Sequence, residues 1–268
     1  MIRKRIKKEV CPAKLYLGDC LSVMPRKVAD HSIDAIITDL PFATTQNKWD
    51  ILIPFEPLWT EYRRVIKPRG VIVLFASQPF SSMLVMSNKE MFKYEWVWSK
   101  NSTSGFLNAL KRPLVSHEVV LIFSPNVPPY YPQGVKPVSG KHKYTGPNDS
   151  TETYGKTKEG YTKIYGEGYP WSVIPFDCER TGAHTTQKPV ALMEYLVRTY
   201  TREGETVLDS TMGSGTTGLG AIRAGRNFVG IEKDEGIFNT ASVRIRTMEK
   251  IGIVVPRVEE ASGFWRSV

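Results

Sequence analysis

The sequence predicts an α/β fold in which a doubly wound, mostly parallel sheet forms the core. Short apolar runs that are typical of buried parallel strands, such as 33–37 and 71–75, alternate with segments of helical spacing. A glycine-rich turn also follows the apolar run at 205–209 and leads into a helix at 213–224. The length of 268 residues is sufficient for one such core with a small inserted module.

The first half of the chain contains the pattern of a βαβ unit followed by further strands. Residues 14–20 are predicted to form a short strand and a turn, and residues 21–29 a brief helix before the strand at 33–37. The polar segment 43–50 has no periodicity and is predicted to be a loop. The remaining predicted elements are helices at 55–66 and 80–88 and strands at 71–75, 94–98 and 117–123.

The character of the sequence changes from Ser124 to about residue 180. Repeated prolines exclude long helices, and more than half of the chain's 12 tyrosines are interleaved with lysines between 130 and 169. A structureless loop of this length is unusual in a compact domain, and aromatic and basic residues together suit nucleic acid. We therefore expect a small irregular insertion with a recognition role, and a surface loop without such a role is the alternative.

Regular patterns return after the insertion. We predict a helix at 190–201, the strand at 205–209, the helix at 213–224, a strand at 227–232 and a helix at 235–250. The chain thus divides into segments 1–123, 124–183, 184–250 and 251–268, the last of which shows no clear pattern.

Composition indicates a globular protein with an anionic partner. The hydrophobic share of 41% and charged share of 24% are ordinary, and the basic N-terminus lacks the long apolar run of a signal peptide, so we expect a cytoplasmic protein without a membrane segment. The net charge of +9 favours nucleic acid, although a solvated basic surface would give the same value. The 3 scattered cysteines indicate neither a disulfide framework nor a zinc site.

The stretch Thr38-Asp39-Leu40-Pro41-Phe42 ends the predicted strand at 33–37. It places a carboxylate, a proline turn and an aromatic ring at the edge of the sheet where α/β proteins bind ligands. We therefore expect an active site there.

A second motif has the layout of a nucleotide site. The predicted strand ending at Asp209 leads into Ser210-Thr211-Met212-Gly213-Ser214-Gly215-Thr216-Thr217-Gly218, and the next strand ends at Glu232. Glycines allow the backbone to approach a ligand at a helix N-terminus, and an acid after the next strand can accept both ribose hydroxyls. The pattern predicts an adenosine-containing ligand and suits either NAD or S-adenosylmethionine.

The residues Asp39-Leu40-Pro41-Phe42 resemble the Asp-Pro-Pro-Tyr/Phe motif of DNA amino-methyltransferases, with Leu40 in place of the first proline. Thr186-Gln187-Lys188-Pro189, within 184–194, resembles the Thr-x-Lys-Pro segment that precedes the cofactor loop in the same family. The resemblance spans residues 15–123 and 184–250. It favours S-adenosylmethionine over NAD as the cofactor.

The order of the motifs resembles the β group of these enzymes, a circularly permuted form of the methyltransferase fold. The resemblance implies a catalytic half at 1–123, a target-recognition insertion at 124–183 and a cofactor-binding half at 184–250. The strands ending at Asp39 and Asp209 would then be neighbours where the strand order reverses. Residues 18–20 would be the third cofactor strand, with Asp19 accepting from the adenine amine of the cofactor. An aspartate that only shapes the turn is the alternative for Asp19.

The resemblance implies two sets of site residues and no metal. The catalytic residues would be Asp39, Leu40, Pro41 and Phe42. The cofactor-binding residues would be Asp19, Cys20, Asp39, Lys188, Asp209, Ser210, Gly213, Ser214, Gly215, Thr216, Thr217 and Glu232.

The implied reaction is direct methyl transfer to the N6 amine of an adenine flipped out of double-stranded DNA. The alternatives are the N4 amine of cytosine, a nicotinamide-dependent oxidoreductase, and a DNA-binding homologue without activity. Asp39 argues against a glutamine methyltransferase, and the cysteines lack the setting that cytosine C5 methylation needs. Many β-group relatives are homodimers, and the sequence leaves both the oligomeric state and a restriction endonuclease partner open.

Overall fold

The computed structural model describes residues 12–43, 50–137, 166–179 and 187–251. The basic N-terminus, the centre of the polar loop at 43–50, most of the predicted insertion and the C-terminal tail lie outside the described residues. The chain forms two compact units, the first comprising residues 1–131 and 172–258 and the second residues 132–171 and 259–268. The internal segment of the second unit, residues 132–171, is shorter than the predicted insertion at 124–183.

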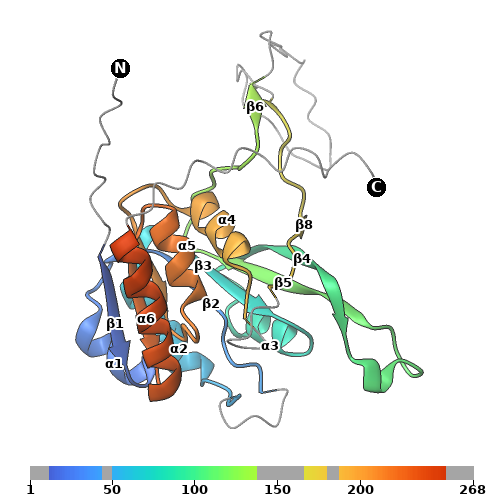
Figure 1. Ribbon diagram of the computed structural model, residues 1–268, viewed down its shortest axis with the longest axis horizontal. Coiled ribbons are helices and arrows are strands. Elements are labelled where there is room, and N and C mark those ends of the chain that lie inside the picture. Colours follow the sequence, from blue (N-terminus) through green and yellow to red (C-terminus); the bar gives the residue numbers. More distant parts are fainter. Residues whose placement is uncertain (1–11, 44–49, 138–165, 180–186, 252–268) are drawn as a thin grey trace. The chain divides into compact units, whose positions relative to one another are not determined.

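The first unit contains a sheet of 8 strands in the order β1-β10-β9-β2-β3-β5-β4-β8. Figure 1 shows β3, β5 and β4 of this sheet side by side. The strands from β1 to β3 in this order are parallel, β5 is antiparallel to both of its neighbours, and β8 is parallel to β4. This confirms the predicted mostly parallel sheet. The strands are β1 (Ala13–Leu17), β2 (Ile33–Thr38), β3 (Ile66–Ala76), β4 (Phe92–Ser104), β5 (Val115–Phe123), β8 (Val173–Pro175), β9 (Thr206–Asp209) and β10 (Asn227–Glu232).

The strand order reverses between β9 and β2, as predicted. Ala35 pairs with Val207 and Ile36 with Leu208, so the two strands run side by side and end at the same edge of the sheet. β1 lies at the outer edge of this half of the sheet beside β10, with Leu17 opposite Glu232. The permuted chain therefore builds the parallel half of the sheet from segments at both of its ends.

Helices cover both faces of the sheet. The residues of α1 (Cys20–Lys27), α2 (Phe55–Val65) and α3 (Phe80–Ser87) pack into one apolar cluster with Ile36, Ile72 and Leu74. The residues of α4 (Val190–Tyr200), α5 (Thr216–Arg223) and α6 (Glu235–Ile251) pack on the opposite face with Ala35, Ile37 and Val73. Consecutive residues of β2 thus point to opposite layers, which is why its sequence is apolar throughout. A short 3-10 helix, η1 (Phe106–Asn108), lies between β4 and β5.

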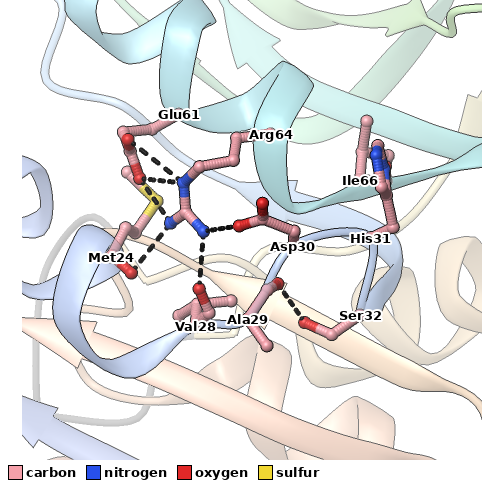
Figure 2. A network of polar contacts seen from close by, with 9 residues as sticks. All are labelled: Met24, Val28, Ala29, Asp30, His31, Ser32, Glu61, Arg64 and Ile66. Atoms are coloured by element: carbon pink, nitrogen blue, oxygen red, sulfur yellow. Dashed lines mark hydrogen bonds and ion pairs between the residues drawn. The ribbon is translucent and has the colours of Figure 1, made fainter.

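Arg64 joins α1 to α2 on the first face (Figure 2). Its guanidinium donates to Glu61 Oε2 at 2.6 Å, to Asp30 Oδ1 at 2.5 Å, and to the carbonyl oxygens of Met24 and Val28 at 2.9 Å each. The Met24 carbonyl also accepts from the N–H of the C-cap residue Val28 at 3.0 Å, so the Arg64 fork adds charged donors to the carbonyls at the end of α1. The contacts fix the helix that follows β1 against the helix that follows β2.

Three strands of the large sheet differ from the sequence prediction. β3 begins at Ile66, because Ile66 pairs with Ile33. A register shift between Ile33 and Ala35 accommodates residues 67–70, which directly follow the predicted helix at 55–66. β4 extends to Ser104, beyond the predicted end at 98, as one arm of a hairpin whose polar residues carry no strand pattern. The short β8 was not predicted, since its 3 residues lie in a proline-containing segment.

The second unit contains a small antiparallel pair among its described residues. β6 (Lys136–Pro137) pairs with β7 (Gly166–Glu167), with Lys136 opposite Glu167. None of the helices in the described ranges is long and apolar enough to cross a lipid bilayer.

Candidate active site

Asp39 follows the last residue of β2 at the edge where the strand order reverses. Its Oδ2 atom accepts a hydrogen bond from Lys188 Nζ at 2.5 Å, and its side chain is 35% exposed. Its Oδ1 atom is covered and has no hydrogen-bond partner among the residues that the structure describes. A buried acceptor without a donor is costly, so this oxygen is a candidate for binding a ligand N–H.

The residues after Asp39 are held by packing on the layer of α1, α2 and α3. Leu40 is only 3% exposed, so its buried side chain anchors the turn at the position where the resembled motif has its first proline. Pro41 and Phe42 are half-buried, and the Phe42 ring stacks on Phe80 with centroids 5.0 Å apart and planes 23° from parallel. This stacking contact fixes the orientation of the Phe42 ring.

The base of the following loop is closed by a hydrogen bond. Ala43 N donates to Asp50 Oδ1 at 2.7 Å, and Asp50 is buried. Residues 44–49, which were expected to lie over the motif, are outside the described part of the chain.

Lys188 connects Asp39 to a second carboxylate that sequence analysis did not identify. Its Nζ atom lies 3.3 Å from Glu118 Oε2 on β5, and Lys100 Nζ on β4 donates to the other Glu118 oxygen. Glu118 follows Ser116 and His117 in the polar first half of β5, before the apolar run 119–123, so no sequence pattern distinguishes it from its polar neighbours. Lys188 itself was expected at the cofactor, and the structure places its ammonium group between these two acids.

The cluster perturbs the titration of its members. Burial raises the pKa of Asp39 by more than the adjacent Lys188 ammonium lowers it. Burial alone would lower the pKa of Lys188, but the carboxylates of Asp39 and Glu118 raise it above its ordinary value. Burial would raise the pKa of Glu118, but the ammonium groups of Lys188 and Lys100 hold it below its usual range. Lys188 and Glu118 are therefore both ionised near neutral pH.

Lys188 is held in place by the start of α4. Pro189 at the N-cap offers no side-chain hydrogen bond, and Glu179 takes over this role by accepting from Val190 N at 2.8 Å. Glu179 also accepts from Gln187 Nε2 at 3.3 Å. Glu179, which lies within the predicted insertion, therefore positions the residues on both sides of Lys188.

The glycine-rich turn after β9 leaves open space above its backbone. Gly213 has a φ of +49°, and a Cβ atom placed there would meet no atom within 4 Å. Its N–H donates to Glu232 Oε2 at 3.0 Å, and Asp234 N donates to Oε1 at 2.9 Å. A carboxylate has about four acceptor sites, so Glu232 can accept two hydroxyls in addition. These residues fit an adenosine ligand with its ribose at Glu232.

Several other predicted cofactor residues are buried beneath the turn or hydrogen-bonded to the residues around it. Asp209 Oδ1 accepts from Thr38 Oγ1 at 2.7 Å and from Thr211 N at 3.1 Å, and burial raises the pKa of Asp209 to about 6. Ser210 Oγ is hydrogen-bonded to Tyr62 OH at 2.7 Å within the core. Thr216 and Thr217 are buried, as is Gly215 with its φ of +81°. Ser214 Oγ is half-buried and donates to Gln187 Oε1 at 3.3 Å.

Asp19 and Cys20 lie where β1 ends beside β10. Asp19 is exposed and caps α1, accepting from Leu21 N at 3.0 Å and from Ser22 N at 3.3 Å. Cys20 is buried, which raises the pKa of its thiol to about 11 and leaves it a poor nucleophile. Both residues share the sheet edge with Glu232, because Gly18 N donates to the Glu232 carbonyl at 2.8 Å.

Thr211 joins the two motifs and was not predicted to do so. Its Oγ1 atom donates to the backbone carbonyl of Asp39 at 2.9 Å and lies 2.8 Å from Thr38 Oγ1. The stretch that contains Asp39 and the glycine turn are thus linked directly by hydrogen bonds. No cluster of metal-binding side chains occurs within the ranges that the structure describes.

Comparisons with known proteins identify the family of the chain. The chain is 28% identical over 231 residues to the DNA adenine methyltransferase YhdJ of Escherichia coli strain K12, covering 80% of this chain and 76% of that protein. It is 26% identical over 294 residues to the type II methyltransferase M.HindIII of Haemophilus influenzae, covering 82% and 91%.

Two solved structures share the fold. The M1.HpyAVI–SAM complex covers 87% of this chain and 99% of its own, with 24% identity and a TM-score of 0.60. The cytosine-N4-specific PvuII DNA methyltransferase covers 94% and 96%, with 17% identity and a TM-score of 0.64. The N6_N4_Mtase family model, described as DNA methylase, matches residues 33–243 and so includes both motifs. The chain therefore belongs to the N6/N4 DNA methylase family.

Proposed function

We propose that this protein transfers a methyl group from S-adenosylmethionine to the N6 amine of adenine in double-stranded DNA. The observation that carries the proposal is the Oδ1 atom of Asp39, a covered acceptor without a donor among the described residues, beside the glycine turn of the neighbouring strand. Family membership supports DNA methylation and argues against a nicotinamide-dependent oxidoreductase, which the glycine pattern alone would permit.

The cofactor and the target base would meet at the edge shared by β9 and β2. S-adenosylmethionine supplies an electrophilic methyl group when it is bound. Gly213 offers backbone beside open space, and Glu232 offers acceptors for the ribose, while Gly215 lets the turn pack closely against Ala241 and Ile245 of α6. Thr211 fixes the distance between this turn and Asp39 through its bond to the Asp39 carbonyl.

Asp39 would activate the amine by orienting it. The lone pair of an exocyclic amine is delocalised into the ring, which makes the nitrogen a poor nucleophile. Asp39 Oδ1 and the Leu40 carbonyl accept its two N–H hydrogens and turn the lone pair toward the methyl carbon. Orientation of this kind can lower the free-energy barrier of a reaction by roughly 7 to 11 kcal/mol. The lone pair then forms the N–C bond, the C–S bond breaks with its electrons remaining on sulfur, and one amine proton leaves to Asp39.

Phe42 would hold the flipped base. Its ring is already oriented by Phe80, so little conformational entropy is lost when a base stacks on it. Such stacking offsets the unstacking cost of about a few kcal/mol that flipping requires.

Adenine is favoured by the aspartate in the first position of the motif, since members of the resembled family with Asp there mostly act on adenine. The relative YhdJ is an adenine methyltransferase. Cytosine N4 is the second candidate, because the PvuII enzyme shares the fold and is cytosine-N4-specific. Both amines require the same two acceptors, so the proposed chemistry of Asp39 is common to both.

Duplex DNA as the substrate is supported by the net charge of +9 and by family membership. The test is transfer of a radiolabelled methyl group from S-adenosylmethionine to a duplex DNA library. Label in duplex DNA is the expected result, and label that appears only in protein or RNA would refute the proposal.

A further inference from the structure

The ammonium group of Lys188 lies between two carboxylates that come from different strands. It is 2.5 Å from Asp39 Oδ2 and 3.3 Å from Glu118 Oε2. Lys188 is 10% exposed and Glu118 is 15% exposed, so water screens neither charge well. A third neighbour is the face of the Phe75 ring, whose centroid lies 5.2 Å from the ammonium nitrogen.

The charges of this cluster balance. Lys100 pairs with the outer oxygen of Glu118, so two ammonium groups face two carboxylates in the order Lys100, Glu118, Lys188, Asp39. Buried charges persist only when they are paired. If Asp39 were the only acid beside Lys188, protonation of Asp39 would leave the lysine without an anion, and Glu118 prevents this.

We propose that Lys188 and Glu118 are positioning residues for Asp39. Lys188 binds Oδ2 and keeps the carboxylate ionised and in one rotamer, so that Oδ1 remains an acceptor for the amine of the target base. Glu118 holds Lys188 in place and keeps it charged while Asp39 takes up the amine proton. The proposal rests on the methyl transfer proposed above, and it assigns Lys188 to the catalytic carboxylate instead of to the cofactor.

The two residues act on Asp39 with opposite sign. The charged groups that face the Asp39 carboxylate are Lys188 and Lys100, which favour its ionised form, and Glu118 and Asp209, which disfavour it. Loss of the adjacent cation therefore raises the pH at which Asp39 ionises, and loss of the adjacent anion lowers it. A residue that served only the fold or the cofactor would produce no such pair of opposite shifts.

The test is the pH profile of kcat under saturating S-adenosylmethionine and duplex DNA. Lys188→Met should move the acidic limb of the profile upward by about one pH unit or more, and Glu118→Gln should move it downward. Lys188→Arg, which retains the charge, should return the limb toward its wild-type position. It also keeps the test available if Lys188→Met does not fold.

A matched control exists at the opposite end of β2. Lys67 Nζ lies 2.7 Å from Asp34 Oδ1, which is the same type of ion pair on the same strand. Lys67→Met should leave the acidic limb where it is in the wild-type enzyme.

A second readout does not depend on activity. The carboxyl carbon of Asp39 can be titrated by NMR in cofactor-free protein labelled with ¹³C at aspartate Cγ, with the signal assigned by its loss in Asp39→Asn. The midpoint should rise in Lys188→Met and fall in Glu118→Gln. Calorimetry should show that Lys188→Met changes the Kd for S-adenosylmethionine by less than about threefold.

Unchanged midpoints in both variants would overturn the proposal, and so would a tenfold or greater loss of cofactor affinity in Lys188→Met. These outcomes are distinct from failure of the proposed function, in which the wild-type enzyme itself would transfer no methyl group to DNA.

Discussion

Lys188 Nζ lies 2.5 Å from Asp39 Oδ2, although the two residues are 149 positions apart in the chain. The contact joins the segment before α4 to the end of β2. Both segments carry motifs that resemble those of amino-methyltransferases, and the contact brings the two motifs together at one edge of the sheet. The predictions below follow from this site and from the strands that build it.

Asp39→Asn should lower kcat for methyl transfer by about 10²- to 10⁴-fold, the range found for loss of a catalytic acid or base. The amide removes the negative charge that accepts the amine proton, whereas the cofactor turn is untouched, so calorimetric affinity for S-adenosylmethionine should remain close to the wild-type value. Asp34→Asn is the control on the same strand and should retain activity. Full activity of Asp39→Asn in steady-state assays would contradict the assigned role.

Gly213→Val should abolish binding of S-adenosylmethionine, because its side chain would fill the open space above the turn. Gly204 also has a positive φ, +81°, and free space at its Cβ, but it precedes β9 at the opposite edge of the sheet. Gly204→Val should therefore lose comparable stability and keep cofactor affinity. Calorimetric titration of both variants distinguishes strain from blocked binding, and equal affinities would contradict a cofactor site above the turn at Gly213.

Asp209 should make the free energy of unfolding depend on pH. Its pKa of about 6 in the folded state exceeds the value of about 3.9 expected in the unfolded chain. The stabilisation from its protonated form is therefore fully present below pH 4 and is lost as pH rises through 6.

Asp209→Asn keeps an acceptor for Thr38 and carries no charge, so its unfolding free energy should not show this loss. Its advantage over wild type should grow by about 1 kcal/mol between pH 5 and pH 7.5. Urea titrations at the two pH values measure this, and a constant difference would refute the pKa assignment.

The module after β5 should confer sequence preference without supporting the cofactor. Tyr131 N donates to the Thr199 carbonyl at 2.8 Å, and the Ser172 carbonyl accepts from Val97 N at 2.7 Å, so both residues belong to the sheet unit. A variant with a Gly/Ser linker in place of residues 132–171 should bind S-adenosylmethionine as the wild type does. Sequencing of its methylated sites should show lost preference, and an unchanged set of sites would place recognition elsewhere.

Much of the fold could be predicted because the apolar runs of β2, β3, β9 and β10 are buried on both faces. Their order followed from the motifs, which indicated a permuted sheet. β8 could not be predicted, because it is a strand only through its pairing of Val173 with Val97 on β4. The length of β4 was also missed, since polar residues in a hairpin arm carry no alternation.

The sequence pointed to most residues of the candidate site but not to the contacts between them. Asp39 and Glu232 were identified by their positions after strands, which a sequence shows directly. The pairing of Lys188 with Glu118 depends on the position of β5 next to β3 in the sheet, so no local sequence pattern predicts it. The burial of Leu40 likewise emerges only when the layer of α2 and α3 is in place.

The central claim is that Asp39 directs methyl transfer to the N6 amine of adenine in duplex DNA. The most direct measurement is mass spectrometry of nucleosides from duplex DNA incubated with the enzyme and S-adenosylmethionine, with Asp39→Ala in parallel. We predict N6-methyldeoxyadenosine with the wild-type enzyme and no methylated nucleoside with the variant. N4-methyldeoxycytidine as the main product would contradict the choice of base, and equal methylation by Asp39→Ala would contradict the mechanism.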